Sequence, residues 1–76
     1  NRVGEARAVL LEAEPIHGKD SGLLHYNLAC YCCLLGDRAA ARLRLRLAGQ
    51  MDRHWRAAAL DDPDLQAMRD EIAAME

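Results

Sequence analysis

Three cysteines, Cys30, Cys32 and Cys33, are the side chains of this 76-residue chain whose type and spacing most readily suggest chemistry. A structural zinc site takes four converging ligands, usually from two separated pairs, and the sequence has no second cysteine pair. An odd number of cysteines in one cluster forms no disulfide framework. Cysteine also packs well as a small residue between helices, so we expect these thiols to serve packing in a reducing compartment, with no metal bound.

The histidines and acids do not form the patterns that catalysis requires. His17, His25 and His54 lack the His-Glu-x-x-His spacing of metalloproteases, and the chain has neither a glycine-rich phosphate loop nor a serine–histidine–aspartate arrangement. The acids of residues 61–64 lack the glycine and distal glutamate of a calcium loop and are better suited to capping a helix. We therefore predict that the protein is not an enzyme and needs no cofactor.

Positive charge is concentrated in residues 38–56, which hold six arginines against a single acid, Asp52. Arg38, Arg42 and Arg46 recur every four residues and therefore share one face of a helix. A cationic stripe of this kind can contact phosphates or an acidic partner. It can also be a solvated face, partly paired with the acids Asp61, Asp62 or Asp64. No aromatic residues are interleaved with the arginines, so we favour the solvated face and do not expect nucleic acid as the partner.

The composition favours an all-α fold. Apolar residues make up 51% of the chain, alanine and leucine dominate, and only three residues are aromatic. No apolar run approaches the roughly 20 residues of a membrane span. Helix-capping and helix-ending residues divide the chain into four helices and one short helical turn. We expect the helices at residues 3–14, 22–35, 38–50 and from 63 onward, with the turn, docked by Trp55, at 54–60.

Local signals set the expected helix boundaries. Pro15 and Gly18 should end the first helix, and Gly36 should end the second by taking a left-handed conformation. The N-caps come from short polar residues, with proline at the first position of the last helix. The expected caps are Asp20 or Ser21, then Asp37, then Asp62.

The block Leu24–Asp52 shows a repeat pattern of small and large apolar residues. Within it the spacing of His25, Leu28, Ala29 and Cys32, followed by Ala41, Leu45 and Ala48, resembles the tetratricopeptide repeat, a helix-turn-helix unit of about 34 residues. Ala6, Leu10 and Ala13 match the last three of these residues at a distance of 35 residues. The resemblance covers residues 5–53.

The resemblance implies antiparallel helix-turn-helix repeats, a fragment of an α-α superhelix with a C-terminal capping helix. Residues 1–20 would be the second helix of a preceding repeat and its linker, residues 21–53 one complete repeat, and residues 54–76 a turn and the capping helix. In this family the first helix of each repeat lines a concave groove. The implied groove residues are Leu23, Tyr26, Asn27, Cys30, Cys33 and Leu34.

The implied function is a non-catalytic protein–protein interaction module that binds a peptide or a partner surface on this groove face. Of the family's carboxylate-binding arrangement only Asn27 is matched, so a carboxylate clamp is not expected. The groove face could instead be covered by upstream repeats, by the terminal segment or by a second copy of the chain. The alternative function is then a structural C-terminal cap or a self-associating unit, such as a homodimer. A weaker alternative is anion or nucleic-acid binding through the arginine stripe. We expect a cytoplasmic location.

Overall fold

The computed structural model describes residues 2–75, and every regular element among them is helical. The prediction of an all-α fold is therefore confirmed for this part of the chain. The elements, in order along the chain, are α1 (Arg2–His17), α2 (Gly22–Leu34), α3 (Arg38–Met51), α4 (His54–Asp61), the 3-10 helix η1 (Pro63–Met68) and α5 (Arg69–Ala74).

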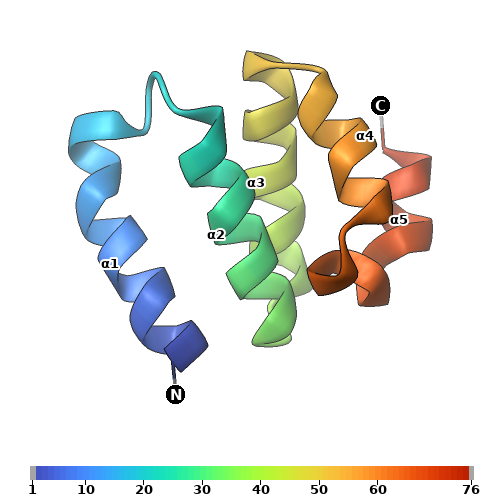
Figure 1. Ribbon diagram of the computed structural model, residues 1–76, viewed down its shortest axis with the longest axis horizontal. Helices are drawn as coiled ribbons and strands as arrows, with labels where there is room; N and C mark the ends of the chain where they lie inside the picture. The colour runs from blue at the N-terminus through green and yellow to red at the C-terminus, as the bar shows by residue number, and fades with distance from the viewer. Residues whose placement is uncertain (1, 76) are drawn as a thin grey trace.

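Helices α2 and α3 form an antiparallel pair in the middle of the molecule (Figure 1). The Ser21 hydroxyl accepts a hydrogen bond from the Leu24 amide (3.0 Å) and begins α2, and the Asp37 carboxylate accepts one from the Ala40 amide (3.1 Å) and begins α3. Between the two helices Gly36 has a φ of 84°, a left-handed conformation that side-chain-bearing residues rarely adopt. The predicted break at Gly36-Asp37 is confirmed.

Helix α1 is longer than predicted, because it continues through Pro15 to His17. Pro15 lacks the amide that would bond to the carbonyl of Leu11, but Leu11 is exposed, so water can hydrate that carbonyl. The helical bond from the Gly18 amide to the Glu14 carbonyl (2.7 Å) still forms after the proline. The prediction that α1 would end at Glu14 was therefore wrong by three residues.

The C-terminal helix is not the single α-helix that was predicted. Asp62 does cap it, accepting a bond from the Asp64 amide (2.9 Å), but the first six residues form the 3-10 helix η1 before α5 begins. A 3-10 helix has three residues per turn, so Leu65 and Met68 lie on one line and both point into the core, at 0% exposure. Burying this pair accounts for the tighter winding.

The core lies between the α2–α3 pair and the C-terminal segment, which we define as residues 54–75 (α4, η1 and α5). Figure 1 shows α1 on one side of α2 and the C-terminal segment on the other. The largest fully buried side chains are Leu28 of α2 together with Leu65, Met68 and Ile72 of the C-terminal segment. Within residues 2–75 no helix is both long enough and apolar enough to cross a membrane.

Candidate functional site

Three of the six predicted groove residues of α2 are buried under the C-terminal segment. Tyr26, Cys30 and Cys33 are at most 8% exposed. The Tyr26 hydroxyl donates a hydrogen bond to Oδ2 of Asp62 (2.7 Å), and its ring lies 4.8 Å from the ring of Trp55. The terminal segment thus fills this part of the groove face, one of the arrangements that the sequence left open.

The other predicted groove residues remain accessible. Leu23 and Leu34 are about half exposed, at 54% and 50%, and Asn27 between them is half-buried. These positions lie about half a helical turn away from His25, whose ring is directed toward α3. The accessible part of α2 therefore faces away from α3.

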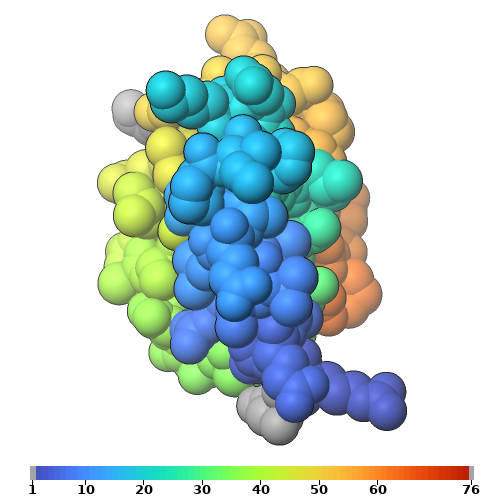
Figure 2. Space-filling model, turned by 90° about the vertical axis from the view of Figure 1, so that its left-hand side faces the viewer, coloured from blue at the N-terminus to red at the C-terminus, as the bar shows by residue number. Residues whose placement is uncertain are grey.

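Helix α1 adds exposed apolar residues on the same side. No residue of α1 is buried, and Val9 and Ile16, seven residues apart, are 63% and 76% exposed. Both lie roughly opposite Glu14, the α1 residue that contacts α3, so they also face away from α3. We call the exposed residues Val9, Ile16, Leu23 and Leu34, with Asn27, the α1–α2 strip. Figure 2 shows the helix α1 in blue as an outer ridge, with α2 visible on one flank and α3 on the other.

A polar network joins α1, α2 and α3 on the opposite side. The Arg44 guanidinium donates to both carboxylate oxygens of Glu14 (3.0 Å to Oε1) and to Nδ1 of His25 (3.1 Å). His25 is 3% exposed, and its Nε2 donates to the Gly18 carbonyl (2.6 Å). We call these four residues the interhelix clamp. The hydrogen bonds from Arg44 hold the pKa of Glu14 below its usual value.

The clamp was not predicted as such from the sequence. The sequence places His25 in the repeat pattern, and Arg44 stands outside the four-residue spacing of the arginine stripe. What the sequence does not reveal is that the two meet, or that Glu14, 30 residues before Arg44, completes the arrangement. The sequence signal that could have indicated the clamp is Arg44 itself, a single arginine on the apolar side of a helix. A half-buried arginine needs an acidic partner.

The arginine stripe is partly neutralised, but by a different acid from those predicted. Arg38 Nη1 donates to Glu71 Oε1 (2.7 Å), and Arg42 Nη1 lies 3.9 Å from Glu71 Oε2. The predicted pairing with residues 61–64 was wrong, because Asp62 is turned inward to Tyr26 and to the amide of Asp64. Among residues 2–75, the guanidinium group of Arg46 forms neither an ion pair nor a hydrogen bond.

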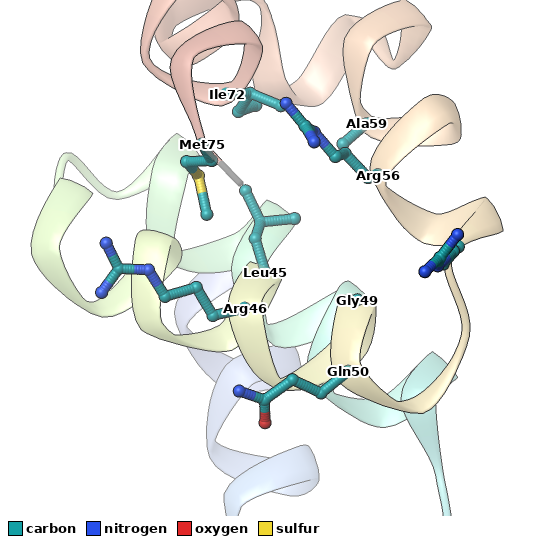
Figure 3. Close-up of a pocket in the computed structure, with 9 residues that line it drawn as sticks. Leu45, Arg46, Gly49, Gln50, Arg56, Ala59, Ile72 and Met75 are labelled. Carbon is teal, nitrogen blue, oxygen red and sulfur yellow. The ribbon is translucent and has the colours of Figure 1, made fainter.

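A pocket of about 470 Å³ lies where Arg46 projects, between α3, α4 and α5. Figure 3 shows its apolar floor and a polar rim that includes Arg46, Gln50 and Arg56. The floor is formed by Leu45, Ala59, Ile72 and Met75, and the rim is completed by Arg53. Neither Arg53 nor Arg56 was singled out from the sequence as a site residue. Arg53 precedes α4 and Arg56 lies in its first turn, and the packing of this short helix on α3 depends on residues far away in the sequence.

The three cysteines are free and buried. Burial raises the pKa of the Cys30 thiol to about 12 and also raises that of Cys33, so both are protonated at neutral pH. Cys30 Sγ, Asp62 and Asp64 come within 4.8 Å of one another. Asp62 already accepts hydrogen bonds from Tyr26, from Cys30 (3.8 Å) and from the Asp64 amide, so this cluster is engaged in holding the C-terminal segment.

Comparisons of the chain with protein-family models, with curated proteins and with solved structures returned no match.

Proposed function

We propose that the protein is a non-catalytic protein–protein interaction module of tetratricopeptide type, and that it binds a helical partner surface along the α1–α2 strip. One observation carries the proposal: α1 has no buried residue and leaves Val9 and Ile16 exposed on the same side as Leu23 and Leu34 of α2. Exposed apolar side chains gathered over two helices are typical of surfaces that associate with other proteins.

The geometry favours a helix as the partner. The strip runs along two adjacent helices, and its apolar positions on each helix are separated by whole turns, at seven residues in α1 and eleven in α2. A helix laid against such a strip can place its own apolar residues between them, which is how helices pack. The half-buried amide of Asn27 offers one hydrogen-bonding group in the middle of the strip.

The arrangement of α1, α2 and α3 also supports the tetratricopeptide interpretation. A helical pair with a left-handed glycine at the turn, and with Ala29, Ala41 and Ala48 fully buried, is the close packing of two helices that the repeat requires. In a superhelix the next helix upstream would lie against α1 and α2, and the α1–α2 strip is the surface it would use. A partner helix would take the same place.

The second candidate function is self-association, in which a second copy of the chain buries the strip. The same exposed residues support it, because a strip of apolar residues on two helices can pack against its own copy around a twofold axis. The two candidates differ in what contacts the strip, and this can be measured directly.

Site-specific photocrosslinking tests both. A photoreactive phenylalanine analogue is placed at Ile16, at Leu23 or, as a matched control, at Leu43, which is 56% exposed on the outer side of α3. Crosslinking is carried out in extract of the source cells and with purified chain alone. We expect adducts with one other protein from Ile16 and Leu23 and none from Leu43.

Two results decide against the proposal. Adducts of the chain with itself, together with a dimer in sedimentation, would replace the partner helix by self-association. Equal crosslinking from all three positions, or none from Ile16 and Leu23, would remove the α1–α2 strip as an interaction surface altogether.

A further inference from the structure

The six arginines of residues 38–56 divide into two groups. Arg38, Arg42 and Arg44 each have a glutamate partner. The other three, Arg46, Arg53 and Arg56, line the pocket between α3, α4 and α5, and none of the other lining residues within 2–75 is an aspartate or glutamate. The Arg56 guanidinium donates to the Ala73 carbonyl (3.3 Å) and forms no ion pair with another residue of the described range 2–75. The described wall of the pocket thus gathers three positive charges, and the acid Glu71 lies with Arg46 and Met75 along an adjoining hollow.

The pocket combines this charge with an apolar floor. Leu45, Ala59 and Ile72 are buried at its base, and Met75 forms one side. Gly49 contributes no side chain, and a Cβ added there would meet no atom within 4 Å, so the glycine leaves the floor open. Glycine is a poor helix former, and its place in the last turn of α3 is not explained by close packing. A volume of about 470 Å³ is large enough for one aliphatic side chain and its neighbouring groups.

The positions of the charges indicate what shape of anion would fit. In Figure 3 the side chains of Arg46 and Arg56 extend to different sides of the floor, so these two guanidinium groups do not converge on one point. One small anion could reach only part of this rim. A chain with anionic groups on either side of an apolar group could pair with several arginines at once, because it would extend across the floor.

The observations favour a peptide over a nucleic acid. Bases are held in such sites by stacking on aromatic rings, and none of the described residues that line the pocket is aromatic. The ring of Trp55, which is close to Arg53 and Arg56 in the sequence, forms tilted ring contacts with Tyr26 and with His54. The side-chain amide of Gln50 on the rim can bond to a peptide backbone, which presents both donors and acceptors.

We propose that this pocket binds an acidic peptide segment of a partner protein, with an aliphatic side chain of the peptide on the Leu45–Ile72–Met75 floor and flanking carboxylates paired with Arg46 and Arg53. The pocket is separate from the α1–α2 strip. A result that contradicts one of the two proposals therefore leaves the other unaffected.

Fluorescence anisotropy with the complete chain tests the proposal. The probe is a labelled octapeptide with a central leucine flanked on each side by two acidic residues. Two further peptides separate the contributions: one has serine in place of the leucine, and one has glutamine in place of every acid. We expect the first peptide to bind best, each change to weaken binding about tenfold or more, and added salt to weaken it further.

Variants of the chain place the peptide in the pocket. Arg46→Glu combined with Arg53→Glu should weaken binding by more than about tenfold, whereas Arg2→Glu, an exposed arginine on α1, should change it less than about twofold. Gly49→Leu fills the floor without reversing a charge and should also abolish binding. Gly4→Leu is its matched control, since a Cβ at Gly4 likewise meets no atom within 4 Å. Circular dichroism establishes that each variant is folded.

Three results would overturn the proposal. The leucine and serine peptides could bind equally, which would mean that the floor is not used. Gly49→Leu could leave binding unchanged in a folded protein, which would place the peptide elsewhere. A labelled single-stranded oligonucleotide of equal charge could bind more tightly than the peptide and lose that binding in the arginine double variant, which would assign the pocket to nucleic acid.

Discussion

Helix α1 and the C-terminal segment pack against opposite sides of α2, but different interactions hold them there (Figure 1). The C-terminal segment contributes Leu65, Met68 and Ile72, each at most 1% exposed, to the core. Helix α1, with twice the length of α4, contributes no buried residue and is fixed by the interhelix clamp through Glu14. One attachment is mainly apolar and the other mainly polar.

The difference indicates which part of the molecule opens first. Burial of a large apolar side chain stabilises by about 1.5–3 kcal/mol, and three such residues hold the C-terminal segment. An ion pair that is partly exposed to water contributes about 1 kcal/mol or less. Helix α1 should therefore separate from α2 at a lower free energy than global unfolding, while the C-terminal segment unfolds with the core. The element that opens more easily is also the one that carries half of the α1–α2 strip.

The largest expected effect comes from the core under the C-terminal segment. Leu65→Ala removes a fully buried side chain and should reduce the free energy of unfolding by about 3 kcal/mol, a large share for a chain of this size. Urea denaturation followed by circular dichroism measures the change. Leu43→Ala, at an exposed leucine, is the control and should stay within about 0.5 kcal/mol. A change below about 1 kcal/mol for Leu65→Ala would mean that this segment is not part of the core.

The second largest effect is expected when the polar attachment of α1 is removed. Arg44→Met keeps an unbranched side chain but leaves Glu14 and the buried His25 without their shared donor, which should cost about 2 kcal/mol. Amide hydrogen exchange should rise in residues 2–17 and stay nearly unchanged in the C-terminal segment. Arg38→Met removes an exposed pair with Glu71 and should cost less than about 1 kcal/mol. Equal exchange in both regions of the Arg44 variant would contradict the contrast drawn between them.

The features that could be predicted from the sequence depend on residues close to one another in the chain. Ser21, Gly36 and Asp37 act on neighbouring residues, so the helices they begin or end were found correctly. The apolar residues Leu65, Met68 and Ile72 follow one another at three and four residues, a spacing that by itself places them on one face of a helix.

The features that could not be predicted depend on contacts between distant residues. The sequence left open whether the groove face of α2 is free or covered, and 36 residues separate Tyr26 from the Asp62 that covers it. The acid that pairs with Arg38 is Glu71, at a separation of 33 residues. The sequence does not distinguish it from several acids that lie nearer to Arg38 in the chain. The prediction that Pro15 would end the first helix failed for a different reason: a proline near the end of a helix removes a single hydrogen bond, which the surrounding turn tolerates.

A smaller effect tests the hydrogen bond that fastens the C-terminal segment to α2. Tyr26→Phe removes the hydroxyl that donates to Asp62 and should lower the free energy of unfolding by about 1 kcal/mol at neutral pH. Burial and the Asp62 carboxylate raise the pKa of Tyr26 above its usual value of 10.0, so the native state holds this proton more tightly than the unfolded state does. The stability from this group is therefore complete below about pH 10 and is lost as the pH rises further.

The phenylalanine variant isolates that alkaline loss. Urea denaturation of both proteins from neutral to alkaline pH should show the difference between them shrinking above about pH 10, since only the parent chain loses the tyrosine contribution. The thiols of Cys30 and Cys33 are present in both proteins and cancel in the comparison. A difference that stays constant with pH would mean that the Tyr26 hydroxyl does not hold the segment.

The smallest effect lies at acid pH and concerns α1 alone. The hydrogen bonds from Arg44 lower the pKa of Glu14 below 4.5, so the native state releases this proton more readily than the unfolded state does. The stability that the Glu14 charge contributes is therefore complete above about pH 4.5 and is lost as the pH falls through the pKa of the native state. Glu14 is partly exposed and screened by water, so the loss should be below about 1 kcal/mol. Comparing Glu14→Gln with the parent chain removes the other carboxyl groups from the measurement. Their hydrogen-exchange rates in residues 2–17 should differ at neutral pH and converge near about pH 3, whereas rates in the C-terminal segment should be the same in both proteins. If the difference persists at acid pH, the charge of Glu14 is not what attaches α1 to the rest of the molecule.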